Sequence, residues 1–251
     1  MARERLAAQG VKTEEIDRAD AGSMARRILS AHSECDGGRL YRLRFDALVS
    51  PDNNYVSILQ TARAAGLTAF PMPYVLTNCH NSYCAVGGTA NEDDHRFGLS
   101  CAKKYGGIFV PRFRGVLHQY IRETMAGHGK MILGSDSHTR YGALGTLGIG
   151  EGGGELVKQL LGRPYDLPRP PVVAVRLTGR LRAGVGPMDA ALAFLAAVFK
   201  NGFVKNKILE FIGEGIAPMS VETLSSTPTV TSPTAVYSRP KTARQKSAPM
   251  A

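Results

Sequence analysis

The chain has 251 residues, of which 43% are hydrophobic and 21% are charged, a balance typical of an ordinary globular protein. No apolar run approaches the roughly 20 residues that a membrane-spanning helix needs, and the four cysteines are too few for a disulfide scaffold of this size. The net charge of +10 raises the question of nucleic acid, but the basic residues are scattered, which favours a solvated surface that also attracts anionic metabolites.

Residues 1–38 form a polar N-terminal segment, with one short helix expected at 23–29. The first residues mix charges and lack the apolar core of a secretory signal, which predicts a cytoplasmic protein. Alternating apolar residues at 41–48 predict a strand. A turn at 51–54 then starts a helix over 55–65, and Gly66 ends it.

Between residues 73 and 134, strands and helices alternate. The strands are expected at 73–77, 108–110 and 131–134, and the helices at 93–105 and 114–126. The first of these strands leads into the polar residues Asn78-Cys79-His80, and the second helix carries His118. Such alternation predicts a layered α/β domain with largely parallel strands over residues 39–165.

The remaining sequence predicts the start of a second α/β domain and a tail. Helices are expected at 155–161 and 187–200, and strands at 172–177 and 208–211. Residues 166–220 are therefore assigned to the second domain. Residues 221–251 are roughly half Ser, Thr and Pro and lack apolar periodicity, so we expect them to be disordered.

A polar cluster follows the apolar run at 131–134. Asp136 and His138 lie two residues apart with Ser137 between them, a spacing that allows a carboxylate to orient an imidazole for acid–base chemistry. Open α/β sheets bind their ligands at the carboxyl ends of the strands, where this cluster is expected to lie. The sequence thus predicts a site here.

One polar cluster and two glycine-rich segments carry a resemblance to a known family. They are Asp136-Ser137-His138-Thr139, Gly142-Ala143-Leu144-Gly145 and Gly148-Ile149-Gly150. The sequence resembles the aconitase superfamily, which comprises aconitases and the large subunits of isopropylmalate dehydratases, over about residues 44–220. The resemblance is greatest to aconitase-like hydratases other than the citrate-cycle aconitases. It implies a three-layer α/β/α domain, truncated here, and a hydro-lyase that dehydrates and rehydrates a small hydroxy-carboxylic acid.

The resemblance also implies catalytic and substrate-binding residues. Asp136 and His138 match family residues that contact the substrate and assist the departure of hydroxide, and His118 matches an active-site histidine on the preceding helix. Ser137 and Thr139 are assigned to substrate binding.

Two further positions depart from the family pattern. His80 matches another active-site histidine, but Cys79 stands where that histidine usually has an aspartate partner. Pro51 takes the place of a glutamine that contacts the substrate, which weakens a citrate-like assignment. Asp94-His95 is interpreted as a helix start rather than as the missing pair.

Family members hold a four-iron–four-sulfur cluster with three cysteines, and they use a serine base on a distal domain. Both are expected beyond the end of this chain, so no metal ligand is assigned within it. The chain is therefore interpreted as an N-terminal fragment, with little or no activity by itself.

Two alternatives stay open. A non-catalytic protein could use the basic surface to bind RNA or other anions, although nucleic acid is not favoured. A metallohydrolase could use His80, His118 and His138. A structural zinc site at Cys79, His80 and Cys84 is disfavoured, because such sites usually have four ligands with paired spacing.

Overall fold

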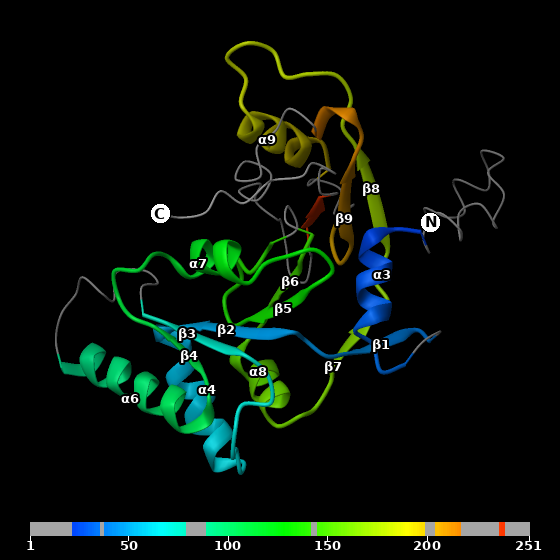
Figure 1. Cartoon of the computed structure of the whole chain (residues 1–251). Helices are drawn as coiled ribbons and strands as arrows, with labels where there is room; N and C mark the ends of the chain where they lie inside the picture. Colours follow the sequence, from blue (N-terminus) through cyan, green and yellow to red (C-terminus); the bar gives the residue numbers. More distant parts are fainter. Residues whose placement is uncertain are drawn as a thin grey trace, which may run out of the picture.

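The computed structural model describes residues 22–35, 38–78, 89–141, 145–198, 204–216 and 236–238. Its centre is a five-stranded sheet in which every pair of neighbouring strands is parallel (Figure 1). In order across the sheet, the strands are β4 (Ile108–Val110), β3 (Tyr74–Thr77), β2 (Ala47–Pro51), β5 (Met131–Gly134) and β6 (Leu147–Gly150). The α/β class with largely parallel strands is therefore confirmed.

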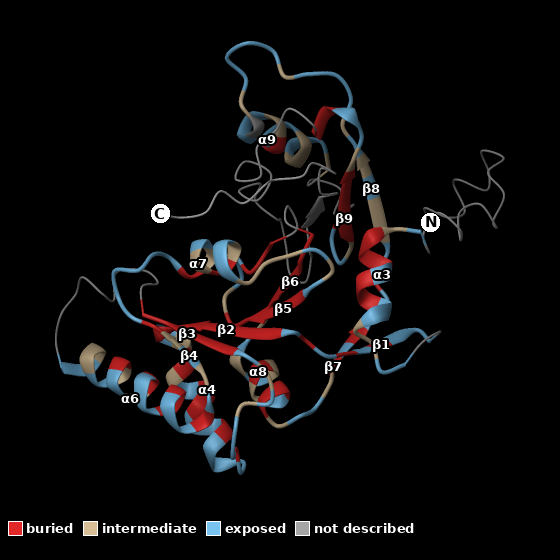
Figure 2. Cartoon of the chain, in the orientation of Figure 1, coloured by how far each residue is buried: buried red, intermediate tan, exposed pale blue. Residues whose placement is uncertain are grey.

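Helices cover both faces of this sheet, which gives the three layers that the sequence predicted (Figure 1). One face carries α4 (Asp52–Ala64), α6 (Thr89–Tyr105) and α8 (Gly153–Leu160), and the other carries α7 (Leu117–Thr124). Because both faces are covered, the strands β2, β3, β5 and β6 are buried along their whole length (Figure 2).

The strands β2, β3 and β5 contribute to two separate cores, since successive side chains point to opposite faces of a sheet. Leu48 and Leu133 belong to the larger core, with α4, α6 and α8. Val49 and Ile132 pack with Leu117 of α7 in the smaller core. The two layers of helices are thus held by the same short strands.

The single strand predicted at 41–48 is in fact two strands, which corrects the sequence-based expectation. β1 (Leu40–Leu43) pairs antiparallel with β7 (Tyr165–Pro168), whereas β2 enters the central sheet. Asp46 lies at the corner between them: its amide donates to the Met131 carbonyl (2.9 Å), and its Oδ2 accepts from the Met131 amide (2.8 Å). Apolar alternation continues through the corner, so the pattern alone did not reveal it.

The short helix predicted at 23–29 is α3 (Met24–Ala31), and it packs into the larger core. Its first turn is bound by a distant carboxylate. Glu210 in β9 (Ile208–Ile212) is buried and accepts hydrogen bonds from the amides of Met24 (3.0 Å) and Ala25 (3.2 Å). A negative charge at a helix N-terminus is favourable, so this contact fastens α3 to β9.

A second, parallel sheet has the order β10-β9-β8, with β8 (Val172–Arg176) and β10 (Val236–Ser238) on either side of β9. The helix α9 (Pro187–Val198) packs on it, and the short helix η1 (Glu214–Ile216) follows β9. The domain boundary predicted at 165/166 falls inside β7, and the division into domains stays a prediction.

Only β10 is described within the tail predicted to be disordered, and the rest of residues 221–251 lies outside the described residues. Among the helices that the structure describes, none is long and apolar enough to cross a membrane.

Candidate functional site

Polar residues follow three of the central strands at one edge of the sheet. Asn78 comes directly after β3, Glu151 directly after β6, and Asp136 two residues after the end of β5. Since the strands are parallel, their carboxyl ends meet at the same edge. This is the edge where open α/β sheets bind ligands, as the sequence predicted for Asp136.

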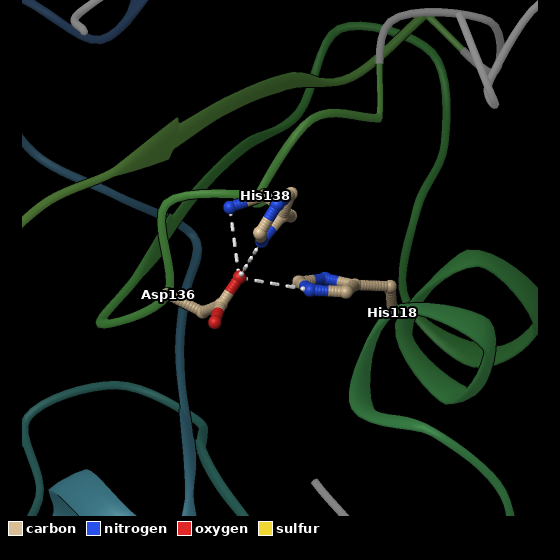
Figure 3. A group of neighbouring side chains, drawn as sticks. All are labelled: His118, Asp136 and His138. Carbon is tan, nitrogen blue, oxygen red and sulfur yellow. Dashed lines mark hydrogen bonds and ion pairs between the residues drawn. The ribbon is translucent and has the colours of Figure 1, made fainter. Parts of the chain in front are cut away.

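Two imidazoles converge on one oxygen of Asp136 (Figure 3). Nε2 of His118, from α7, lies 3.0 Å from Asp136 Oδ1, and Nδ1 of His138 lies 3.1 Å from the same atom. The backbone amide of His138 also donates to this oxygen, at 2.7 Å. Three of the four side chains that the resemblance assigned to catalysis therefore form one cluster, although the rest of α7 and all of β5 lie between His118 and Asp136 in the chain.

The cluster opens to solvent on one side. The side chains of His118 and Asp136 are 15% and 12% exposed, whereas that of His138 is 80% exposed. The pair formed by His118 and Asp136 is thus largely shielded, and His138 is free to meet a ligand from solution. Such a gradient suits a site that exchanges protons with a bound molecule.

A tyrosine that the sequence interpretation missed orients His118. The hydroxyl of Tyr141 lies 3.1 Å from His118 Nδ1, and its ring is fully buried. Burial raises the pKa of Tyr141, so its hydroxyl stays protonated at neutral pH. Because this hydroxyl occupies Nδ1, the other ring nitrogen, Nε2, faces Asp136. Tyr141 stands between Thr139 and Gly142, within the stretch that carries the family resemblance, and that position was the only signal available.

The loop after β5 keeps its shape through Thr139 and two glycines. The Thr139 hydroxyl donates to the Asp136 carbonyl (2.7 Å), and the side chain is fully buried. A Cβ atom at Gly134 would overlap Thr139, and one at Gly150 would overlap the Asp136 carbonyl. The glycine frame of the motif therefore allows close approach of the loop. Thr139 holds this loop, and its role in substrate binding stays a prediction.

An open pocket of about 380 Å³ adjoins Asp136. It is lined by Ser135, Asp136, Ser137, Gly150, Glu151 and Gly152. Ser137 is exposed there, which suits its predicted contact with substrate. The carboxylate of Glu151 accepts a hydrogen bond from Tyr165 at 2.7 Å, and this carboxylate was not singled out in the sequence.

A buried arginine, also missed, lies next to Gly150, which lines the pocket. Arg140 donates through Nη1 to the Thr139 carbonyl (2.7 Å), and its Nε has no hydrogen-bond partner among the described residues. Burial lowers the pKa of Arg140, while the charges of Glu151 and Asp136 act in the opposite direction. The guanidinium thus adds positive charge near the carboxylates of Glu151 and Asp136.

A second histidine–carboxylate pair joins Asp52, the first residue of α4, to His95 of α6. His95 Nε2 is 3.2 Å from Oδ2 of Asp52, and both side chains are buried. Next to them, the Tyr55 hydroxyl donates to Asn78 Oδ1 at 2.6 Å. Burial raises the pKa of Asp52, and His95 acts to lower it. His95 lies in the second turn of α6 rather than at its start.

The predicted residue His80, with Cys79 and Cys84, lies outside the described residues, so its position relative to Asp136 stays a prediction. The two described cysteines do not fit an iron–sulfur cluster, which needs several thiolates around one centre. Cys101 is packed in the larger core, where burial raises its pKa and favours the thiol, and Cys35 is exposed before β1.

Residues 26–228 match the model of the aconitase family (aconitate hydratase). The chain is 30% identical over 212 residues to the mitochondrial aconitate hydratase of Saccharomyces cerevisiae, and 29% identical over 224 residues to the mitochondrial homocitrate dehydratase of that yeast. It is 29% identical over 213 residues to the mitochondrial aconitate hydratase of Candida albicans. These matches cover 78%, 79% and 78% of this chain but only 27%, 28% and 27% of the relatives.

These relatives contradict the predicted cytoplasmic location, because their names place them in mitochondria. That prediction was wrong. It rested on the missing apolar core of a secretory signal, and mitochondrial targeting segments are amphipathic and basic, so this criterion does not exclude them.

Proposed function

Because the chain belongs to the aconitase family, we propose that it supplies one wall of a hydro-lyase active site that removes and adds water on a small hydroxy-carboxylic acid. The observation that carries the proposal is the convergence of His118 and His138 on Asp136 at the carboxyl end of β5, beside the pocket. Acid–base chemistry on a hydroxyl group needs a proton donor held within hydrogen-bond reach of a ligand site.

In this proposal the histidines and Asp136 have different roles. His138 is the exposed imidazole and donates a proton to the departing hydroxyl. Asp136 fixes the orientation of both rings, and His118, held by Tyr141, keeps the carboxylate in place. The hydroxyl of Ser137 binds a substrate carboxylate at the mouth of the pocket. His80 is the fourth catalytic side chain, as the family resemblance implies.

The substrate class comes from the relatives. Two relatives are named for aconitate hydration and one for homocitrate dehydration, and both of these compounds carry several carboxylates. The net charge of +10 favours the approach of such anions. We therefore assign the site to small polycarboxylates that bear a hydroxyl group.

Members of this family generally depend on an iron–sulfur cluster. The described cysteines do not fit one, so no step is derived through it here. For the same reason we expect little or no dehydratase turnover from the purified chain. Turnover with aconitate or homocitrate, together with bound iron, would contradict this expectation.

Binding can be tested without turnover. Aconitate or homocitrate, added to the purified chain, should shift the imidazole resonance of His138 and the amide resonances of residues 135–137 in a saturable way. Ser137→Ala should weaken this binding about tenfold, as expected for the loss of a hydrogen bond to a charged group. Ser57→Ala, on the exposed side of α4, is the matched control. Without a saturable shift at Asp136 and His138, the assignment of the site is wrong.

A further inference from the structure

The cluster of His118, Asp136 and His138 also has the composition of a metal site. One ligand atom from each residue lies within 4.8 Å of the other two (Figure 3). We propose that these three side chains bind a divalent transition-metal ion of the zinc type. The inference concerns the same residues as the proposed function but does not rest on it.

The spacing of the donor atoms supports an ion between them. Ligands at about 2.0–2.2 Å from a metal lie about 3.0–3.5 Å from one another in tetrahedral or octahedral geometry. Nε2 of His118 and Nδ1 of His138 lie 3.0 Å and 3.1 Å from Asp136 Oδ1. The third distance, between the two nitrogens, is at most 4.8 Å. An ion would therefore lie to one side of the three atoms, bonded to each, and the imidazoles would turn toward it as the shared protons leave.

The groups around the cluster already orient the ligands. A metal-binding histidine usually uses its second ring nitrogen in another hydrogen bond, which fixes the ring. Tyr141 makes such a contact with His118 Nδ1 at 3.1 Å, and this leaves Nε2 toward the cluster. The carboxylate of Asp136 is likewise fixed by the His138 amide at 2.7 Å.

Exposure determines how the ion would be reached. Only His138 is strongly exposed, so an ion enters from its side and keeps positions open to water or to a small carboxylate. Two imidazoles and one carboxylate suit zinc, iron(II), cobalt(II) or nickel(II) better than calcium or magnesium, which prefer oxygen ligands. An ion bound here would displace the protons that His118 and His138 share with Asp136, and it would change the acid–base properties of the site.

Within the described part of the chain, this is the one group of three such ligands. Two other histidines have a single carboxylate partner each, Asp46 for His32 (3.0 Å) and Asp52 for His95 (3.2 Å). These pairs lack a second imidazole. They provide an internal control, because a histidine–carboxylate pair alone should not hold the ion.

The experiment uses the tag-free chain, stripped of metal and titrated with cobalt(II). We expect one ion per chain, with the visible absorption of a four- or five-coordinate cobalt site that zinc displaces. Loss of one ligand in His138→Asn or His118→Asn should weaken binding at least about 100-fold, more than the loss of a neighbouring hydrogen bond. His32→Asn should leave binding unchanged.

Folding must be separated from binding. His138 is exposed, so His138→Asn should retain the far-ultraviolet circular dichroism of the parent chain and is the deciding variant. Three outcomes would overturn the proposal: no saturable binding, cobalt absorption that survives in both histidine variants, or absorption that depends on Cys79 and Cys84. A thiolate charge-transfer band would reveal the last case. None of these outcomes bears on polycarboxylate binding.

Discussion

Gly150 and Gly134 let the loop after β5 fold back against the sheet. At Gly150 the obstacle to a side chain is the Asp136 carbonyl, which is backbone and cannot rotate away. We expect Gly150→Ala to lower the free energy of unfolding by about 2–3 kcal/mol, which urea denaturation would measure. The same change should displace Asp136 from His118 and weaken ligand binding.

Gly154→Ala is the control for this prediction. Gly154 lies in α8, and a Cβ there would meet no atom within 4 Å. Alanine is the better helix former, so this variant should be neutral or more stable by up to about 1 kcal/mol. Equal losses from both variants would mean that the close approach at Gly150 does not matter.

Asp52 gives a pH-dependent prediction. Its pKa is raised above the ordinary value of 3.8, chiefly by burial. A raised pKa in the folded state contributes stability that is fully present below 3.8 and is lost as the pH rises through the folded-state pKa. At neutral pH the ionised Asp52 therefore costs stability. We expect the free energy of unfolding of Asp52→Asn, relative to that of the parent chain, to increase as the pH rises from 4 to 7.

Urea denaturation at several pH values would measure this difference. His95 limits the gain, because it favours the ionised form of Asp52. A difference that shrinks with rising pH would show that the contact with His95 outweighs burial. Asp166→Asn, an exposed position, should show no comparable trend.

Of the residues that make up the candidate site, the sequence identified some and missed others. The motif located Asp136 and His138, and the resemblance added His118, which the structure brings to the same oxygen. Tyr141 and Arg140 were not predicted, because their roles depend on which way a buried side chain points. No spacing in the sequence encodes that direction.

Among the elements, α3 depends on a residue far away in the chain. Glu210 accepts from two amides of its first turn, across a sequence separation of more than 180 residues. We expect Glu210→Ala to lower the free energy of unfolding by about 2–3 kcal/mol, since it leaves buried amides without an acceptor. Amide hydrogen exchange in α3 should accelerate as well.

Glu34→Ala is the matched control for Glu210→Ala. Glu34 is partly exposed and pairs with Arg44 at 2.5 Å. An exposed pair of this kind contributes about 0–1 kcal/mol, so the loss should be small. Faster exchange in α3 from both variants would mean that Glu210 has no specific role at the helix N-terminus.

The elements themselves were largely predictable, and the sheets were not. Local periodicity indicated α4, α7 and the strands β2, β3, β4 and β5 close to where they lie, but it did not predict β6, which lies in a glycine-rich segment. It joined β1 to β2, because the corner at Asp46 is made by hydrogen bonds to Met131 and not by a turn sequence. Pairing partners such as β1 with β7 depend on distant residues, which periodicity does not report.

For the molecule as a whole, the net charge of +10 keeps RNA binding open as an alternative prediction. A protein that neutralises several phosphates loses affinity steeply as salt rises. If the chain is retained on immobilised RNA at physiological salt, and this retention disappears when residues 221–251 are removed, RNA binding belongs to the tail. No retention at low salt would end the alternative.

The way the cores are shared predicts how the molecule unfolds. The larger core combines α3, the central sheet, Tyr165 of β7 and Ile208 of β9, so it crosses the domain boundary predicted at 165/166. Among the described residues, the core of the second sheet contains only four buried residues, namely Val204, Leu209, Phe211 and Ile216. So small a core gives little stability by itself. We therefore expect one cooperative transition from residue 22 to residue 216 rather than two.

Circular dichroism and tyrosine fluorescence should follow the same urea curve in this chain, which has no tryptophan. Ile208→Ala opens a cavity in the shared core and should lower the free energy of unfolding by about 2–4 kcal/mol while keeping a single transition. Leu192→Ala, exposed on α9, should change it by less than about 0.5 kcal/mol. Two separate transitions in the urea curve of Ile208→Ala would contradict this expectation. They would mean that the second sheet unfolds while α3 and the central sheet stay folded, and hence that it is a separate folding unit.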